Sequence, residues 1–357
     1  MKKVLFSIFL AAALLSCGNR NYTLEGRAQS AEMNGVTVVI NTFDGERWSN
    51  LSEVIVENQR FVLRGTVEKP MIARLEFNDR ERQIRGRKAF VLENTHIQFD
   101  IDENMLITVS GSRDNNLLQL FENDLAALIS QEFIDSVQGR LVPELELQAR
   151  IQEYSARRTA MIIDFSKRHI NTLPGTLIFT ENSHALPVED RIAVLDLMNA
   201  ATRDNSRVRA VAQQVETEQS VAIGNQFIDF GLFTPAGEIL SLSDFVGHHD
   251  YVLLQFWASW CGPCIRSLPE LIEFHASQDR RRFEVFAVSL DNDKAAWEGA
   301  IDRHRIPWVQ VSDLLGFESP IGQLYAVSFI PTKILIDRNG TIVGRNLSIS
   351  EMAELMN

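Results

Sequence analysis

Two cysteines three positions apart, Cys261 and Cys264, restrict the fold of this chain more than any other feature. They follow a short apolar segment, Tyr251 to Phe256, that is typical of a buried strand, and they stand where a helix is predicted to begin. Pro263 between them is compatible with a first helical turn, because its missing N–H would be unpaired there anyway. A strand followed directly by a helix indicates an α/β layer architecture for the last third of the chain.

This position makes the two thiols chemically unequal. Cys261 is expected at the helix N-terminus, where unpaired backbone N–H groups and the helix dipole favour its thiolate and therefore its action as a nucleophile. Cys264 is expected one turn further in, where it stays protonated until a mixed disulfide forms on Cys261 and then resolves it. Trp257 and Trp260 are expected to cover the site, and Gly262 to allow a close approach of the backbone. No cofactor is expected besides the redox-active disulfide.

The remaining cysteine, Cys17, ends a segment that has the character of a signal sequence. Residues 1–3 are a short basic region and residues 4–15 an apolar run, which is too short to span a bilayer. The sequence Leu-Leu-Ser before Cys17 resembles the lipobox of bacterial lipoproteins. The resemblance implies cleavage before Cys17 and an acyl anchor on it that holds the protein to a lipid bilayer of the cell envelope; an ordinary signal peptide is the alternative.

The cysteine count also limits other kinds of site. The chain has three cysteines, so without Cys17 none is left for a structural disulfide framework beside the Cys-x-x-Cys pair. No second pair of Cys or His residues has the spacing that would complete a zinc site, and no metal is expected. The charge balance, 35 basic against 47 acidic residues, opposes binding to nucleic acid.

A chain of 357 residues is long enough for two or three domains, and its sequence pattern changes twice. Residues 22–112 alternate short apolar segments with turn residues, which predicts an antiparallel β-sandwich or barrel, with a polar connection of hairpin length at residues 57–60. Residues 113–218 show helical spacing, interrupted at residues 172–175. Residues 222–357 form the predicted α/β domain. The predicted strands are 36–40, 54–56, 61–63, 73–77, 90–92, 97–101, 107–109, 251–256, 283–290, 332–336 and 341–344, and helices are predicted to begin near Cys261, Lys294 and Ser319.

These residues carry a resemblance to a known family. Residues 224–357 resemble the TlpA/ResA branch of the thioredoxin superfamily, which is related to the AhpC/TSA redoxins, and the redox motif is matched at Trp260-Cys261-Gly262-Pro263-Cys264. Pro331 resembles the family's cis-proline, which implies that the backbone of Ile330 contacts the bound substrate. Pro269 resembles the proline that kinks the thioredoxin helix, and residues 291–310 the insertion of this branch, with Trp297 and Trp308 expected in its core.

The chain also departs from the family pattern. Gln255 takes the place of the buried thioredoxin carboxylate, and Ser267 the place of an acid found in ResA-like proteins. Both residues are neutral, so Glu270, a water molecule or no dedicated base serves Cys264. Residues 22–112 resemble the domain of unknown function that precedes TlpA-like domains in Bacteroidetes lipoproteins, for example at residues 90–94 and 109–112.

The resemblance implies a thiol-disulfide oxidoreductase that faces the periplasm. Gly-Pro between the cysteines favours a reductase, because it is the thioredoxin dipeptide, associated with a potential of about -270 mV. The implied partners are exported proteins with disulfides or thiols, including apocytochromes c, and a membrane thiol electron donor. A disulfide oxidase or isomerase is the alternative within redox chemistry, and a lipid-anchored binding module the alternative outside it. A peroxidase is disfavoured because no cysteine lies in a Pro-x-x-x-Thr-x-x-Cys motif.

Overall fold

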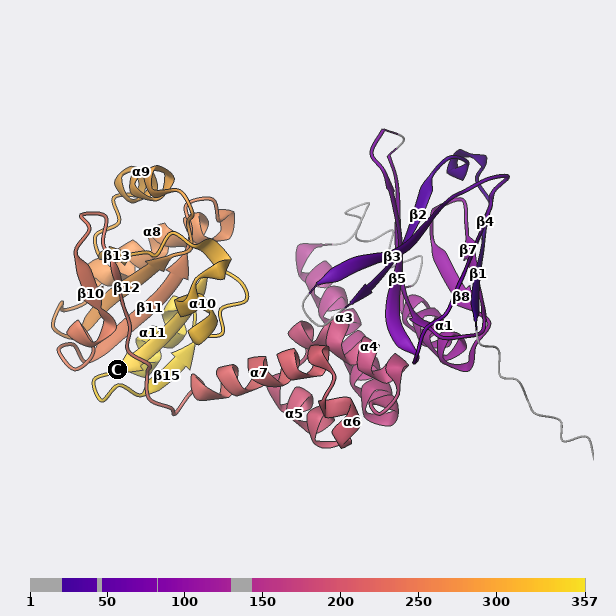
Figure 1. Cartoon of the computed structure of the whole chain (residues 1–357). Coiled ribbons are helices and arrows are strands. Elements are labelled where there is room, and N and C mark those ends of the chain that lie inside the picture. Colours follow the sequence, from indigo (N-terminus) through magenta and orange to yellow (C-terminus); the bar gives the residue numbers. More distant parts are fainter. Residues whose placement is uncertain (1–20, 44–46, 82, 130–142, 357) are drawn as a thin grey trace, which may run out of the picture. The chain divides into compact units, whose positions relative to one another are not determined.

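The computed structural model describes residues 21–43, 47–81, 83–129 and 143–356. The predicted signal segment and Cys17 lie outside the described residues. The chain divides into two compact units, one that ends at Val211 and one that begins at Ala212. Figure 1 shows strands and then helices in the first unit and a mixed α/β arrangement in the second. Within the described ranges, no helix is both long and apolar enough to cross a bilayer.

The first unit begins with two four-stranded sheets, as far as the described residues show. Their strands present alternating buried and exposed side chains, so each sheet buries one face. Leu24, Ile40, Leu75, Phe90 and Phe99 fill the shared core. One sheet has the order β4 (Arg60–Gly65), β1 (Tyr22–Ala28), β7 (His96–Ile101), β8 (Ile107–Ser110), and the other β3 (Trp48–Ile55), β2 (Thr37–Phe43), β5 (Met71–Asp79), β6 (Ile84–Leu92). The prediction of an antiparallel sandwich is confirmed, although β1 pairs with β7 in parallel.

The predicted hairpin at residues 57–60 is only half right. Glu57 and Arg60 exchange backbone hydrogen bonds of 2.9 and 3.0 Å, which closes a tight turn. Asn58 and Gln59 both have positive φ, as such a turn requires. However, β3 before the turn and β4 after it belong to different sheets, because β4 pairs with β1. The turn therefore carries the chain from one layer of the sandwich to the other.

Helices follow the strands, as the sequence predicted. They are α1 (Arg113–Ala126), α3 (Glu144–His169), α4 (Leu173–Asn182), α5 (Val188–Asp196), α6 (Ala200–Arg203) and α7 (Ser206–Ser220), and the last of these crosses the boundary between the units. Buried Asn115 ties α1 to the sandwich, because its amide bonds the backbone N–H and carbonyl of Val91, both at 2.8 Å. The predicted break at residues 172–175 is confirmed: Thr172 caps α4 by accepting the N–H of Gly175.

The second unit is built on a five-stranded sheet of order β13 (Val309–Val311), β12 (Phe283–Ser289), β11 (Tyr251–Trp257), β14 (Thr332–Asp337), β15 (Ile342–Arg345). Strands β13, β12 and β11 are parallel to one another, whereas β14 is antiparallel to both of its neighbours. A small hairpin, β9 (Gly231–Phe233) and β10 (Ile239–Ser241), precedes the sheet. The helices are α8 (Gly262–Ser277), α9 (Lys294–His304), α10 (Pro320–Leu324) and α11 (Ile349–Met356).

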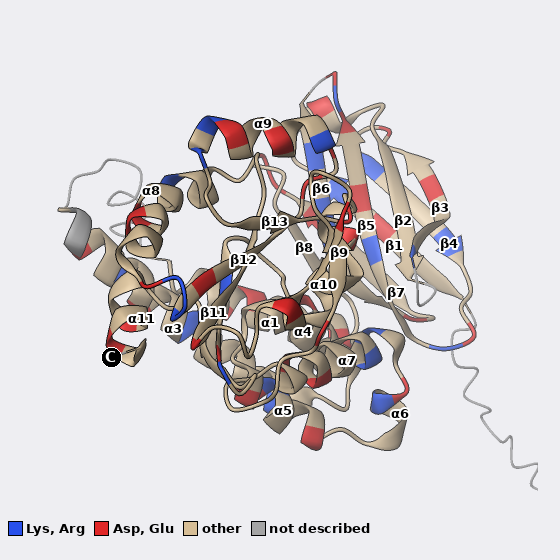
Figure 2. Ribbon diagram, turned by 90° about the vertical axis from the view of Figure 1, so that its left-hand side faces the viewer, with Lys and Arg blue, Asp and Glu red and all other residues tan. Residues whose placement is uncertain are grey.

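Both faces of this sheet are buried, which is why its strands are almost continuously apolar. Leu253, Trp257 and Leu335 face one core together with Leu268 of α8. The neighbouring residues of the same strands, such as Leu254, face the other. The helix α9 of the insertion carries both signs of charge (Figure 2) and buries Trp297. The unit is thioredoxin-like, as the resemblance predicted, and both Trp297 and Trp308 lie in its core.

Candidate active site

The two cysteines lie at the start of α8, in the turn that follows β11. Cys261 is the N-cap residue, and its sulfur accepts the backbone N–H of Cys264 at 3.2 Å. The two residues form a disulfide, with their Cα atoms 5.2 Å apart. Cys261 is 4% exposed and Cys264 is fully buried, so a substrate can reach the sulfur of Cys261 before that of Cys264. This inequality is the one that a stepwise exchange of disulfides requires.

A segment far along the chain completes the site. The peptide bond between Ile330 and Pro331 is cis, as the resemblance predicted. The carbonyl oxygen of Ile330 lies 3.7 Å from the sulfur of Cys261. The backbone of Ile330 therefore lies beside the sulfur of Cys261. This is the position where the resemblance places the substrate chain.

The prediction that two tryptophans cover the site is wrong for one of them. Trp257 is fully buried, and its indole N–H donates to Oε1 of Gln310 at 2.9 Å. It points into the core because it continues the alternation of β11, which places it on the same face as Leu253. Trp260 comes after the strand has ended and is 57% exposed. Only Trp260 is therefore available at the surface of the site.

The predicted close approach of the backbone at Gly262 is also wrong. A Cβ atom at this position would meet, among the described atoms, only the guanidinium of Arg266 at 3.3 Å. That side chain is flexible and could move aside. Gly262 is exposed, and nothing packs its backbone tightly.

Exposed apolar side chains gather around Cys261. Trp260 and Phe317 lie with ring centroids 6.0 Å apart, and Phe317 is 48% exposed. Phe329 is 57% exposed and precedes Ile330, which contacts Cys261. Of these three aromatic residues, the sequence motif identified only Trp260. Phe317 lies in a short 3-10 helix, Gly316–Glu318, and Phe329 in a loop, and neither belongs to a regular sequence pattern, so only the fold could place them here.

A buried carboxylate supports the turn before Cys261. Asp291, directly after β12, accepts hydrogen bonds from the N–H of Ser259 at 2.9 Å, the hydroxyl of Ser259 at 2.5 Å and the hydroxyl of Ser289 at 2.7 Å. Its side chain is almost completely buried. In the sequence alone, Asp291 stands out only as the first residue of the insertion. The sequence does contain one signal for Asp291. It is an acidic residue at the end of a buried strand, β12, and that strand pairs in parallel with β11, which leads into the motif.

The surroundings of Cys264 are polar but hold no carboxylate at the two positions where the resemblance places one. The hydroxyl of Ser267 donates to the carbonyl oxygen of Cys264 at 2.9 Å. Gln255 is buried on β11, directly across from Lys333 of β14. Glu270, which sequence analysis considered as a base, is exposed on α8.

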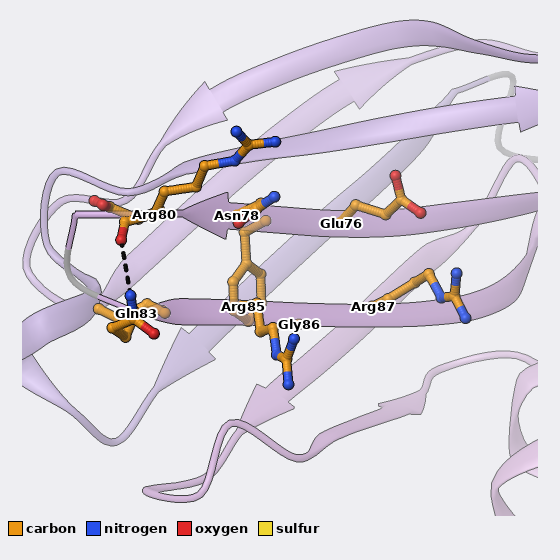
Figure 3. A pocket seen from close by; sticks show the side chains of 10 residues that line it. Glu76, Asn78, Arg80, Gln83, Arg85, Gly86 and Arg87 are labelled. Atoms are coloured by element: carbon orange, nitrogen blue, oxygen red, sulfur yellow. Dashed lines mark hydrogen bonds between the residues drawn. The ribbon is translucent and has the colours of Figure 1, made fainter. Parts of the chain in front are cut away.

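The first unit has a cavity of its own, on the hairpin of β5 and β6 (Figure 3). Its lining is polar, with Glu76 directly across the strands from Arg87 and Asn78 across from Arg85. Gln83 bonds the carbonyl oxygen of Arg80 at 3.3 Å. As far as the structure describes the hairpin, the lining contains no cysteine or histidine, so it offers no nucleophile for the chemistry of the second unit. Among the described residues, no three His, Cys, Asp or Glu side chains are placed to hold a metal ion.

Comparison with known proteins agrees with this geometry. Residues 223–345 match the model of the AhpC/TSA family. The thiol-disulfide oxidoreductase ResA of Geobacillus kaustophilus is 32% identical over 123 residues, which are 34% of this chain and 68% of that protein. The chain belongs to the ResA family of thiol-disulfide oxidoreductases. The ResA of Oceanobacillus iheyensis is 29% identical over 140 residues, which are 38% of this chain and 70% of that protein.

Parts of the chain are also similar to solved structures and to a second family model. A thiol-disulfide oxidoreductase from Bacteroides fragilis is 34% identical, with a TM-score of 0.35 over 37% of this chain and 99% of its own. The thioredoxin domain of a thiol-disulfide oxidoreductase from Bacteroides vulgatus is 27% identical, with a TM-score of 0.36 over 39% of this chain and 100% of that one. Residues 22–118 match the family described as Domain of unknown function (DUF4369), so the predicted N-terminal resemblance is confirmed. The ResA-like part is thus an enzyme that exchanges thiols and disulfides.

Proposed function

We propose that the protein is a lipid-anchored, periplasm-facing reductase of disulfides in exported proteins, with Cys261 as nucleophile and Cys264 as resolving thiol. The observation that carries the proposal is the position of this pair at the start of α8, with one sulfur near the surface and the other buried. Trp260 and the backbone of Ile330 beside Cys261 would contact the substrate, while Gly262 and Pro263 complete the motif.

The proposed exchange needs no group beyond the two cysteines and their partners. The thiolate of Cys261 attacks one sulfur of the substrate disulfide, so that a mixed disulfide forms and the other substrate sulfur leaves as a thiolate. The thiolate of Cys264 then attacks Cys261, the internal disulfide forms, and the substrate leaves as a dithiol. A membrane thiol donor would supply the two electrons that return the pair to its reduced form.

The location in the cell rests on the lipobox resemblance at Cys17. An acyl chain on this residue would hold the soluble units at a bilayer without a membrane-spanning helix. Fractionation of cells that produce the full chain tests this part. We expect the wild type in the membrane fraction and Cys17→Ser in the soluble fraction of the cell envelope. Equal membrane association of the two would refute the acyl anchor.

Trapping of substrates tests the catalytic roles. In the native host, Cys264→Ala should retain a mixed disulfide on Cys261, because the resolving thiol is missing. The matched control is the double variant Cys261→Ala/Cys264→Ala, which cannot form that bond. Reducible adducts specific to the single variant, identified by mass, would name the substrates and show whether apocytochromes c are among them. A trap as empty as the control would support the alternative of a binding module.

The direction of exchange is tested separately, by equilibration of the purified protein with glutathione buffers. A reductase should have a potential near that of thioredoxin, about -270 mV. A potential between about -120 and -180 mV would instead support the oxidase or isomerase.

A further inference from the structure

A pair of polar side chains, one buried and one half-buried, lies on the face of the sheet that packs against α8. Gln255 and Lys333 are directly opposite in the antiparallel pairing of β11 with β14, so their side chains lie on the same face. On each strand they are flanked by residues of the core that contains both cysteines, namely Leu253 and Trp257 on β11 and Leu335 on β14. The pair therefore lies on the same face of the sheet as the core that contains the disulfide.

The amide of Gln255 is one half of this pair and lacks a hydrogen bond. Gln255 is 1% exposed, and its carbonyl oxygen Oε1 has no hydrogen-bond partner among the described residues. A buried acceptor without a donor destabilises the folded state. An ammonium group with three N–H donors on the adjacent strand could satisfy it.

Lys333 is the other half, and it is half-buried in a position unusual for a lysine. Burial lowers the pKa of its ammonium group, and the carboxylate of Glu270 on α8 opposes this effect in part. Among the described residues, Glu270 is the charged neighbour that acts on Lys333. The side chain facing Lys333 from β11 is the neutral amide of Gln255, and from the end of β15 the neutral amide of Asn346, which accepts the N–H of Lys333 at 2.9 Å. Lys333 is thus able to exchange a proton closer to neutral pH than an exposed lysine.

We infer that Lys333 is the proton acceptor of Cys264 in this chain, and that the oxygen of Gln255 holds the ammonium group that forms. This inference rests on the proposed function, because it assigns a base to its resolving step. The neutral amine takes the proton of the Cys264 thiol, the resulting thiolate attacks the sulfur of Cys261, and the substrate thiolate leaves. Gln255 and Ser267, which hold no charge, cannot take that proton themselves.

The test follows the two cysteines separately with an aromatic disulfide, 5,5'-dithiobis(2-nitrobenzoate). The full chain with Cys17→Ser is used, so that the redox pair holds its only thiols. The first coloured thiolate is released when Cys261 attacks, and the second when Cys264 resolves the mixed disulfide. If the first thiolate is not released, the proposed role of Cys261 is wrong. A change in the rate of the second release alone tests the role of Lys333.

For Lys333→Met we expect an unchanged first phase and a second phase that is slower by about a hundredfold or more at neutral pH, the lower end of the effect of a general base. Its rate should approach that of the unmodified enzyme as the pH is raised and Cys264 ionises without help. Lys333→Arg keeps the charge but cannot accept a proton, so it should be as slow as Lys333→Met. The exposed Lys294→Met is the matched control. Full rescue by Lys333→Arg, or an unchanged second phase in Lys333→Met, would overturn the inference.

Discussion

The carboxylate of Asp291 accepts the backbone N–H of Ser259 at 2.9 Å and thereby fastens the turn that carries Cys261 to the end of β12. Asp291→Ala removes this bond and those to the hydroxyls of Ser259 and Ser289, and it leaves buried donors without an acceptor. We expect the free energy of unfolding of the second unit to fall by about 3 kcal/mol. Urea denaturation measures it. Glu273→Ala, at an exposed position of α8, should change it by less than about 0.5 kcal/mol, and a similar small change for Asp291→Ala would contradict the anchoring role.

The pair of Trp260 and Phe317 should matter for protein substrates but not for small ones. Both rings are exposed, so Trp260→Ala and Phe317→Ala should leave the stability nearly unchanged. Loss of an aromatic contact with a polypeptide lowers its affinity by roughly 1–2 kcal/mol, and we expect the rate of insulin reduction to fall about tenfold. The reaction of Cys261 with a small aromatic disulfide serves as the control. Equal losses on both substrates would show that the rings support the cysteine rather than bind the protein chain.

The pair of His275 and Glu284 predicts a specific dependence of stability on acid. Burial by itself raises the pKa of Glu284, but hydrogen bonds from His275, the N–H of Val285 and Arg280 outweigh it and hold the pKa below its ordinary value. The stabilisation from Glu284 is therefore complete above the pKa of the unfolded chain, about 4.3, and is lost as the pH falls through the lower pKa of the folded state. The difference in unfolding free energy between wild type and Glu284→Gln should shrink below about pH 4.3.

Urea denaturation of both proteins at several pH values between about 3 and 7 measures this difference. If the difference stays constant over that range, the pair of His275 and Glu284 does not contribute in the way the geometry indicates.

Phe90 tests the core of the β-sandwich. Its ring packs edge-on against Phe99 with centroids 5.0 Å apart, and both rings are buried. Phe90→Ala should lower the free energy of unfolding of the first unit by about 3–5 kcal/mol, as measured by thermal and urea unfolding. Both phases of the reaction with the aromatic disulfide should be unchanged, because the cysteines lie in the other unit. Val62→Ala, at an exposed position of β4, is the matched control.

The sequence predicted the parts of the fold that have regular spacing. The alternation at residues 97–101 and the apolar run before Cys261 became β7 and β11. The first strand, β1, was missed because Glu25 and Arg27 interrupt its apolar residues with charges on the solvent side. The local sequence at residues 57–60 also described the turn correctly, but which strands pair across the molecule depends on contacts between distant segments, and no turn sequence contains that information.

The same limit explains what was missed at the site. The motif identified Cys261 and Cys264, and the resemblance pointed to Pro331, because these residues are adjacent in sequence or typical of the family. Asp291, Phe317 and Lys333 reach the site only through the order of the strands and the loops between them. Trp257 was misjudged for a related reason: its direction is fixed by the pleat of β11 and not by its closeness in sequence to Cys261.

Neither unit is held together by a disulfide outside the redox pair, since the only other cysteine in the chain is Cys17. An enzyme that handles disulfides thus contains no structural thiol that its own reaction could oxidise, reduce or mispair. If Cys17 carries the proposed acyl chain, each covalent intermediate on Cys261 has two possible fates: capture by Cys264 or transfer to another molecule. The fold of each unit would then depend on no disulfide, and a change between oxidising and reducing surroundings would alter covalent bonds only at the redox pair.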